Sequence, residues 1–286
     1  MKSKQTLYLI DDDEDDRMFI RNALEDILTS VRIIEFTTAE DALRGLNQEF
    51  KPSLILMDIN MPRLSGVEAL STIRSDSSTK HIPVVLFSTS SDPAMIRESY
   101  VLGVNAYIVK PTSIEGYLAV ARAIKMCFFH TGPFPEITKS LSRAAKKTIL
   151  VIEDNADHWD LMRLSLSNLD KVKLVHLKSA GCTMDFLRNE YLDYVPAIEL
   201  IVLDLYLPER QQGLDLIEHI RSFFISKNLP PVPVIIFSAS ALQEDIVASY
   251  QRQANVYITK SYDLAQSAFH LKDVCTAWSR VIALPV

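Results

Sequence analysis

The chain has 286 residues, of which 48% are hydrophobic and 23% charged, with a net charge of −6. At roughly 150 residues per domain, this length indicates two globular domains, each able to bury its own core. The acidic balance and the lack of a long basic stripe disfavour a nucleic-acid surface. The apolar run behind the basic N-terminus is far too short for a signal peptide or a membrane span, so we expect a soluble, cytoplasmic protein that binds neither nucleic acid nor membrane.

The first predicted strand, Thr6 to Ile10, runs directly into six consecutive acids in the stretch LYLIDDDEDD. Acids at the start of a helix complement its exposed N–H groups and the positive end of its dipole. Taken alone, the cluster is therefore most simply explained as the solvated start of a helix that follows the strand. The rest of the chain changes this interpretation, because the cluster recurs.

Similar sequence segments recur in the second half of the chain. LYLIDDDEDDRMFIRNAL returns as ILVIEDNADHWDLMRLSL, and PSLILMDINMPRLSGVEALSTIR returns as IELIVLDLYLPERQQGLDLIEHIR. IPVVLFSTS returns as VPVIIFSAS, and GVNAYIVKP returns as QANVYITKS. The offset between matched residues drifts slowly, as a few loop insertions require. The chain is therefore a tandem duplication.

Each copy alternates short β-branched runs with amphipathic stretches, a pattern typical of βαβ units around a parallel sheet. The copies are expected to occupy residues 1–129 and 147–286, with a linker at 130–146 that contains prolines, a glycine and a basic cluster. The strands expected in the first copy are Thr6 to Ile10, Arg32 to Phe36, Ser53 to Met57, Pro83 to Phe87 and Asn105 to Val109.

The repeated polar residues all fall at the carboxyl ends of predicted strands, where open α/β sheets bind ligands. Asp11, Asp12, Asp58, Ser88 and Lys110 should therefore converge. Three carboxylates repel one another unless a hard divalent cation lies between them, and Mg²⁺ suits that position. Because a lysine and a serine hydroxyl can bind the remaining oxygens of a phosphate, the set predicts phosphoryl transfer.

Both halves resemble receiver (CheY-like) domains of two-component response regulators. The resemblance covers nearly the whole chain outside the linker, and it rests on four features that recur in order: the acid pair, the Asp with MP or LP three residues on, the Ser after an apolar strand, and the Tyr three residues before the Lys. It implies two doubly wound, flavodoxin-like (βα)5 domains with parallel sheet order 2-1-3-4-5. It also implies that Asp58 and Asp204 accept a phosphoryl group from a histidine kinase or a histidine phosphotransfer protein.

The resemblance assigns metal ligands by position. Asp12 and Asp58 would bind Mg²⁺ directly, Asp11 would act through water, and the carbonyl of Asn60 would complete the protein ligands. The matching ligands of the second site are Asp154, Asp204, Glu153 and the carbonyl of Tyr206.

The remaining repeated residues would act on the phosphoryl group or respond to it. Singly, each has a simpler explanation: a Ser that caps a turn, a solvated Lys, a Tyr that packs on the sheet. Their recurrence in one order favours function. The residues expected to contact phosphoryl oxygens are Ser88, Ser238, Lys110 and Lys260, and the expected switch tyrosines are Tyr107 and Tyr257. The six histidines show no metal spacing or triad partner and are expected to be packing or surface residues: His81, His130, His158, His176, His219 and His270.

The two sites differ near the acceptors. Two residues beyond the acceptor, Asn60 is small whereas Tyr206 is a large aromatic that could shield an acyl phosphate from water. The resemblance also implies a cis peptide bond between Lys110 and Pro111, which Ser261 after Lys260 does not favour.

The segment after Lys260 is long enough for one helix and a short tail, so no separate output domain is expected. The output would then be contact with a downstream protein or with a second copy in a homodimer. Three alternatives stay open: a phosphorylation-independent receiver-like scaffold, a hydrolase of the haloacid dehalogenase type, and a DNA-binding regulator. The complete residue sets, the lack of an Asp two residues beyond the acceptor, and the acidic balance argue against them in turn.

Overall fold

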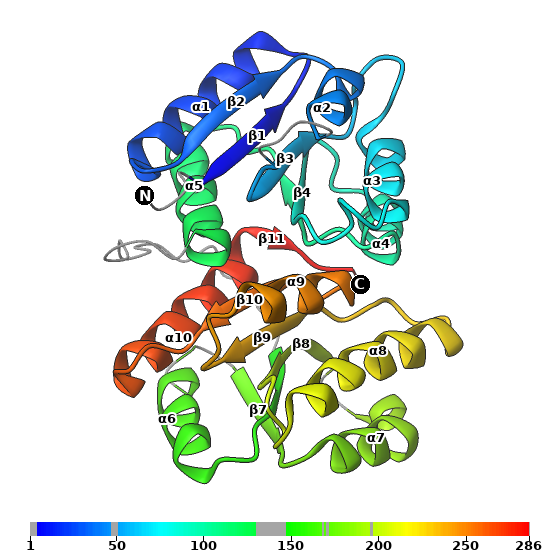
Figure 1. The fold of residues 1–286 in the computed structure, drawn as a ribbon, viewed down its shortest axis with the longest axis vertical. Coiled ribbons are helices and arrows are strands. Elements are labelled where there is room, and N and C mark those ends of the chain that lie inside the picture. Colours follow the sequence, from blue (N-terminus) through cyan, green and yellow to red (C-terminus); the bar gives the residue numbers. More distant parts are fainter. Residues whose placement is uncertain are drawn as a thin grey trace. The chain divides into compact units, whose positions relative to one another are not determined.

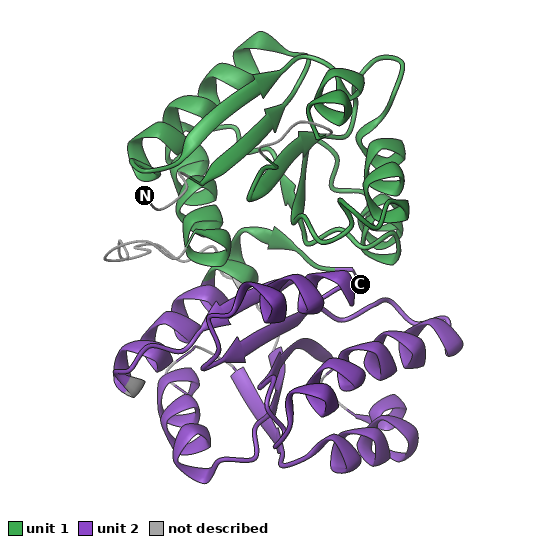
Figure 2. Ribbon diagram, viewed as in Figure 1, with its two compact units in different colours: residues 1–137, 277–284, 286 green, residues 138–276, 285 purple. Residues whose placement is uncertain are grey.

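The computed structural model describes residues 5–46, 51–129, 147–167, 169, 172–194 and 197–285. The chain forms two compact units, one of residues 1–137, 277–284 and 286 and the other of residues 138–276 and 285 (Figure 2). The sequence places residues 147–286 in one domain, whereas here residues 277–284 belong to the first unit. The predicted linker, 130–146, lies outside the described residues.

The first unit is a twisted sheet covered by helices on both faces (Figure 1). Its strand order is β11-β5-β4-β3-β1-β2. Helices α1 and α5 pack together on one face, and α2, α3 and α4 cover the other. The elements are β1 (Thr6–Ile10), α1 (Glu14–Ile27), β2 (Arg32–Phe36), α2 (Ala39–Gly45), β3 (Leu54–Asp58), α3 (Gly66–Ser75), β4 (Val84–Ser88), α4 (Pro93–Val101), β5 (Ala106–Val109), α5 (Ile114–Phe128) and β11 (Ile282–Ala283).

The second unit repeats this architecture, with strand order β10-β9-β8-β6-β7. The predicted order 2-1-3-4-5 is confirmed in both sheets. The elements are β6 (Lys147–Ile152), α6 (Ala156–Leu166), β7 (Val172–Leu177), α7 (Ala180–Asn189), the 3-10 turn η1 (Tyr191–Asp193), β8 (Ile198–Leu203), α8 (Arg210–Ser226), β9 (Val234–Ser238), α9 (Gln243–Gln251), β10 (Val256–Thr259) and α10 (Leu264–Arg280). The end of α10, from residue 277, belongs to the first unit.

The central strands are buried along their full length because helices cover both of their faces. Every residue of β1, β3 and β4 is buried, as the uninterrupted apolar runs predict. Two of these strands begin one residue later than expected, so Asp58 and Ser88 are the last residues of β3 and β4. The polar residues of the site therefore follow directly from the rigid centre of the sheet.

The acids after β1 have different structural roles. Asp11 is buried at the end of the strand, whereas the side chain of Asp13 caps α1 by accepting from the N–H of Asp16 at 3.0 Å. Glu14, Asp15 and Asp16 form the first turn of α1, where negative charge complements the helix dipole. The solvated helix start and the polar site are thus both present in one run of acids.

The sheet of the first unit has a sixth strand that the sequence did not indicate. β11 pairs antiparallel with β5, with Ile282 opposite Ile108 and Ala283 opposite Tyr107. The hydroxyl of Tyr100 donates to the carbonyl of Ala283 at 3.0 Å. A two-residue strand after a long helix has no period-2 pattern, so hydrophobic periodicity could not reveal it. Among the described residues, no helix combines the length and apolar character needed to cross a bilayer.

Replacing Ile282 with Asp is expected to destabilise the first unit by about 2–4 kcal/mol, because the side chain is buried and a carboxylate there would lack a partner. Urea unfolding followed by far-UV circular dichroism measures this loss. Ile225→Asp is the matched control, since Ile225 is exposed on α8 and should change stability by at most about 0.5 kcal/mol. Equal effects of the two substitutions would show that β11 contributes nothing to the first unit.

Candidate functional site

The acids of the first unit meet at the carboxyl edge of its sheet. Asp11 follows β1 and Asp58 ends β3, and the two side chains are 1% and 6% exposed. Carboxylate oxygens of Asp11, Asp12 and Asp58 lie within 4.8 Å of one another. The N–H groups of Asp13 and Asn60 donate to Asp11 and Asp58 at 3.0 and 2.8 Å, so local backbone turns fix both carboxylates.

Lys110 brings a positive charge into this cluster. It follows β5, and its own N–H donates to the carbonyl of Ser88 at 2.7 Å. Its ammonium donates to Asp11 and Asp16, each at 2.8 Å, and lies 3.1 Å from Asp58. The strand ends β1, β3 and β5 thus converge on one point, as the sequence predicts.

The electrostatics of the first site follow from this crowding. Burial raises the pKa of Asp11 to about 6; the Lys110 contact opposes this rise and the charge of Asp58 adds to it. Burial alone would lower the pKa of Lys110, but hydrogen bonds to Asp11 and Asp16 and the nearby carboxylates outweigh burial and raise it. Lys110 therefore stays charged, and the carboxylates are only partly compensated by it.

The second unit repeats the arrangement. Glu153 follows β6, Asp204 follows β8 and Lys260 follows β10. The ammonium of Lys260 donates to Asp204 at 2.7 Å and to Glu153 at 2.9 Å. Burial raises the pKa of Glu153, while Lys260 opposes the rise and Asp204 adds to it. The N–H of Tyr206 donates to Asp204 at 3.3 Å, as Asn60 does in the first unit.

The second site differs from the prediction in one member. The group whose possible ligand atoms lie within 4.8 Å of one another is Glu153, His158 and Asp204, and the exposed Asp154 is not part of it. His158, expected to be a packing or surface residue, thus lies beside the acceptor site. Its Nδ1 lies 3.3 Å from the ammonium of Lys260. The signal in the sequence was the repeat itself, because His158 matches Asp16 in the alignment of the two copies.

The serines and tyrosines predicted to respond to phosphorylation are buried in both units. Ser88 and Ser238 end β4 and β9, and their hydroxyls accept from the N–H two residues on, at 3.1 and 3.2 Å. The hydroxyl of Tyr107 donates to the carbonyl of Ser90, and that of Tyr257 to the carbonyl of Ser240, each at 2.9 Å. Both phenols are held against the loops that follow β4 and β9.

Tyr206 is tied to a buried acid that the first unit lacks. Its hydroxyl donates to Asp245 at 3.1 Å, and Arg210 and Ser240 donate to the same carboxylate. Burial alone would raise the pKa of Asp245, but the hydrogen bonds from Ser240, Arg210 and Tyr206 outweigh burial and lower it. The corresponding residue of the first unit is Met95, whose sulfur lies 3.5 Å from the Tyr107 hydroxyl. The sequence alone did not reveal this network.

The peptide bond between Lys110 and Pro111 is not cis, so the implied cis bond is wrong for this chain. Among the described residues, the cis bond is Leu207–Pro208. A trans bond before proline is the ordinary preference, by about 0.5–1 kcal/mol. Lys110 reaches its carboxylates with this geometry.

The donor set of the first site fits a hard divalent cation. Oxygen ligands bound at about 2.1 Å around one ion lie at most about 4 Å apart, which is compatible with the spacing of Asp11, Asp12 and Asp58. Three carboxylates with one ammonium also leave excess negative charge at the edge of the sheet. The arrangement can therefore hold a cation and, through it and Lys110, a phosphate-sized anion.

Comparison with known proteins identifies the family. Residues 7–122 and 149–270 each match the response regulator receiver domain, and together these segments span most of the chain. The chain therefore belongs to the response regulator receiver family and contains two receiver domains in tandem.

Individual proteins are similar to parts of the chain. The chain is 32% identical over 208 residues to histidine kinase P4 of Formosa agariphila, covering 68% of this chain but only 15% of that kinase. It is 30% identical over 143 residues to response regulator Rcp1 of Synechocystis, covering 49% of this chain and 93% of Rcp1. Among solved structures, the phosphorylated cyanobacterial phytochrome response regulator RcpA is 30% identical, covers 47% of this chain and 100% of its own, and gives a TM-score of 0.43.

Proposed function

We propose that each receiver accepts a phosphoryl group on an aspartate, Asp58 in the first unit and Asp204 in the second, with Mg²⁺ as cofactor. The donor would be a histidine kinase or a histidine phosphotransfer protein in the cytoplasm. The observation that carries the proposal is the convergence of a lysine ammonium on the acceptor carboxylate and a second buried acid in both units. This role is signalling in a two-component phosphorelay, not turnover of a substrate.

The chemistry assigned to the residues is a nucleophilic displacement. A carboxylate oxygen of Asp58 or Asp204 attacks phosphorus, and the bond from phosphorus to the donor's leaving group breaks. A bound Mg²⁺ would neutralise phosphoryl oxygens. It would be held by Asp11, Asp12 and Asp58, with the carbonyl of Asn60 as a further ligand.

The chain's own residues would stabilise the transferred group. Lys110 and Lys260 would neutralise a phosphoryl oxygen, a role supported by the position of each ammonium within 3.1 Å of the acceptor carboxylate. Ser88 and Ser238 would turn their hydroxyls toward another oxygen. Tyr107 and Tyr257 would then move, and the altered surface would be read by a downstream protein or by a second copy of the chain.

The test is to incubate the protein with acetyl phosphate and Mg²⁺ and to locate added phosphate by mass spectrometry. We expect two phosphates on the wild type, and one each on Asp58→Ala and Asp204→Ala. Chelation of the metal should abolish labelling in all three proteins. No labelling of the folded wild type would instead favour a phosphorylation-independent scaffold.

The two acyl phosphates are expected to differ in lifetime. Tyr206 is anchored by Asp245 beside Asp204 and should slow the approach of water, whereas Asn60 is small. Tyr206→Asn is expected to speed hydrolysis at Asp204 by up to about tenfold, which corresponds to ~1.4 kcal/mol of activation free energy. The measurement is the decay of phosphate on Asp204 in an Asp58→Ala background. Tyr262→Asn, at an exposed tyrosine of the same unit, is the control; equal decay in all three proteins would contradict the prediction.

A further inference from the structure

The two acceptor sites differ in one residue that can bind a metal. Asp16 is the third residue of α1 and His158 is the third residue of α6. The backbone N–H of each residue donates to the side chain that caps its helix. Asp16 donates to Asp13 at 3.0 Å, and His158 donates to Asn155 at 3.1 Å. The same position in the first helical turn therefore places a carboxylate beside Lys110 in the first unit and an imidazole beside Lys260 in the second.

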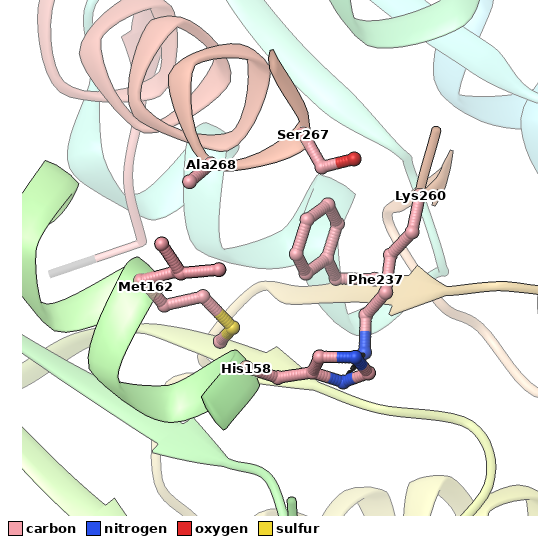
Figure 3. Close-up of a pocket in the computed structure, with 7 residues that line it drawn as sticks. His158, Met162, Phe237, Lys260, Ser267 and Ala268 are labelled. Atoms are coloured by element: carbon pink, nitrogen blue, oxygen red, sulfur yellow. Dashed lines mark hydrogen bonds between the residues drawn. The ribbon is translucent and has the colours of Figure 1, made fainter. Parts of the chain in front are cut away.

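The imidazole is directed into the second site. His158 Nδ1 lies 3.4 Å from Glu153 Oε1 and 3.3 Å from the ammonium of Lys260. Figure 3 shows the side chains of His158 and Lys260 pointing toward one another. His158 and Lys260 also line a small pocket, together with Leu161, Met162, Phe237, Ser267 and Ala268.

His158 Nδ1 and two carboxylates surround the ammonium of Lys260. The ammonium lies 3.3 Å from His158 Nδ1, 2.9 Å from Glu153 and 2.7 Å from Asp204. In the neutral tautomer with its proton on Nε2, an imidazole Nδ1 accepts from an ammonium and has the lone pair that a metal ion needs. The three side chains thus surround one cation position, which the lysine ammonium fills in this structure.

The ligand sets of the two sites consequently differ in kind. The first group, Asp11, Asp12 and Asp58, offers oxygen alone, whereas the group of Glu153, His158 and Asp204 offers two oxygens and one nitrogen. Carboxylates suit Mg²⁺, Ca²⁺ and Mn²⁺, while imidazole suits Fe²⁺, Ni²⁺, Cu²⁺ and Zn²⁺. Ligand atoms bonded to one such ion at about 2.0–2.2 Å lie about 3–4 Å apart. In this structure, His158 Nδ1 lies 3.4 Å from Glu153 Oε1.

We propose that the second acceptor site, although it also takes Mg²⁺, prefers a first-row divalent transition ion bound through His158 Nδ1, Glu153 and Asp204, whereas the first site prefers an ion with oxygen ligands alone, such as Mg²⁺. The proposal rests on the proposed function in taking Asp204 as the acceptor. It gives the tandem receivers different metal preferences, so that metal occupancy of the second receiver would respond to the supply of transition metal.

The test uses Co²⁺ and Mg²⁺ as probes on the full chain. In an Asp58→Ala background, isothermal titration gives the ratio of Co²⁺ to Mg²⁺ affinity at the second site. Changing even a residue that only supports a metal ligand typically costs 10–100-fold in affinity, so His158→Asp should lower this ratio by at least about tenfold. A paramagnetically shifted imidazole N–H resonance should appear with Co²⁺ and be absent in His158→Asp. His219→Asp, at an exposed histidine of α8, is the control and should change neither signal.

The outcomes separate this proposal from the proposed function. An unchanged affinity ratio in His158→Asp, or no shifted imidazole resonance in the wild type, overturns the metal assignment. Phosphorylation of Asp204 with Mg²⁺ is measured on the same proteins by mass spectrometry. Labelled Asp204 with an unchanged ratio would refute the metal proposal alone, whereas a lowered ratio with unlabelled Asp204 would support the metal proposal and refute the acceptor role.

Discussion

Alanine in place of Gly213 is expected to destabilise the second unit by about 3 kcal/mol or more and to abolish phosphorylation of Asp204. A Cβ at this position would lie 1.9 Å from the carbonyl oxygen and 2.6 Å from the carbonyl carbon of Leu205, the residue after the acceptor. These are backbone atoms, so no side-chain rotation can relieve the overlap, and the cost exceeds ordinary overpacking. Gly66 faces the same restriction, because its Cβ would lie 2.2 Å from the carbonyl oxygen of Asp58.

The chain offers a matched control in the same unit. At Gly181, on α7, the nearest atom to an added Cβ is the Ser179 hydroxyl at 3.9 Å, so Gly181→Ala should be neutral or stabilise by up to about 1 kcal/mol. Urea unfolding gives the free energies, with Trp159 as the fluorescence probe of the second unit in a Trp278→Phe background. Acetyl phosphate labelling measures the acceptor. If Gly213→Ala behaved as Gly181→Ala does, the close packing of α8 on the acceptor loop would be irrelevant to the site.

Removal of either lysine is the second large effect that we expect. Lys110→Ala and Lys260→Ala should each slow phosphorylation of their own acceptor by about 10²–10³-fold, the usual effect of losing one donor that stabilises developing charge. The same substitutions should tighten metal binding. In each site the ammonium contacts carboxylate oxygens that a metal cation would bind. Lys110 lies 2.8 Å from Asp11, and Lys260 lies 2.9 Å from Glu153.

These two opposite effects distinguish a role in the site from a role in folding. Rates are measured with acetyl phosphate, and metal affinity by calorimetry. Lys51→Ala is the control, because Lys51 is exposed and donates to the carbonyl of Ser78, away from both acceptors. Weaker metal binding together with slower phosphorylation would mean that the lysines merely support the fold of the site.

The sequence predicted the sheets well because their signals are local. Short β-branched and apolar runs predicted β1 and β2 at their observed bounds, and placed β3, β4 and β5 within one residue. The duplicated order of polar residues then predicted which side chains would meet. Asp11, Asp58 and Lys110 do meet, because parallel strands end at one edge of the sheet.

What the sequence missed depends on contacts between distant segments. β11 is two residues long, and its pairing with β5 is set by tertiary contact with Tyr100 and Tyr107. The sequence spacing of His158 from other histidines gave no sign that its side chain lies beside the carboxylates Glu153 and Asp204. Asp245 lies 39 residues beyond Tyr206 and so could not be assigned to it from sequence spacing.

The central claim is that each unit forms a metal-dependent site for a phosphoryl group on its own aspartate. Fluorine NMR of the protein with Mg²⁺ and beryllofluoride, which mimics a phosphoryl group on a carboxylate, tests it most directly. We expect two distinct sets of bound fluoride resonances, one lost in Asp58→Ala and the other in Asp204→Ala. Absence of bound resonances in the folded wild type, or their persistence after both substitutions, would contradict the claim.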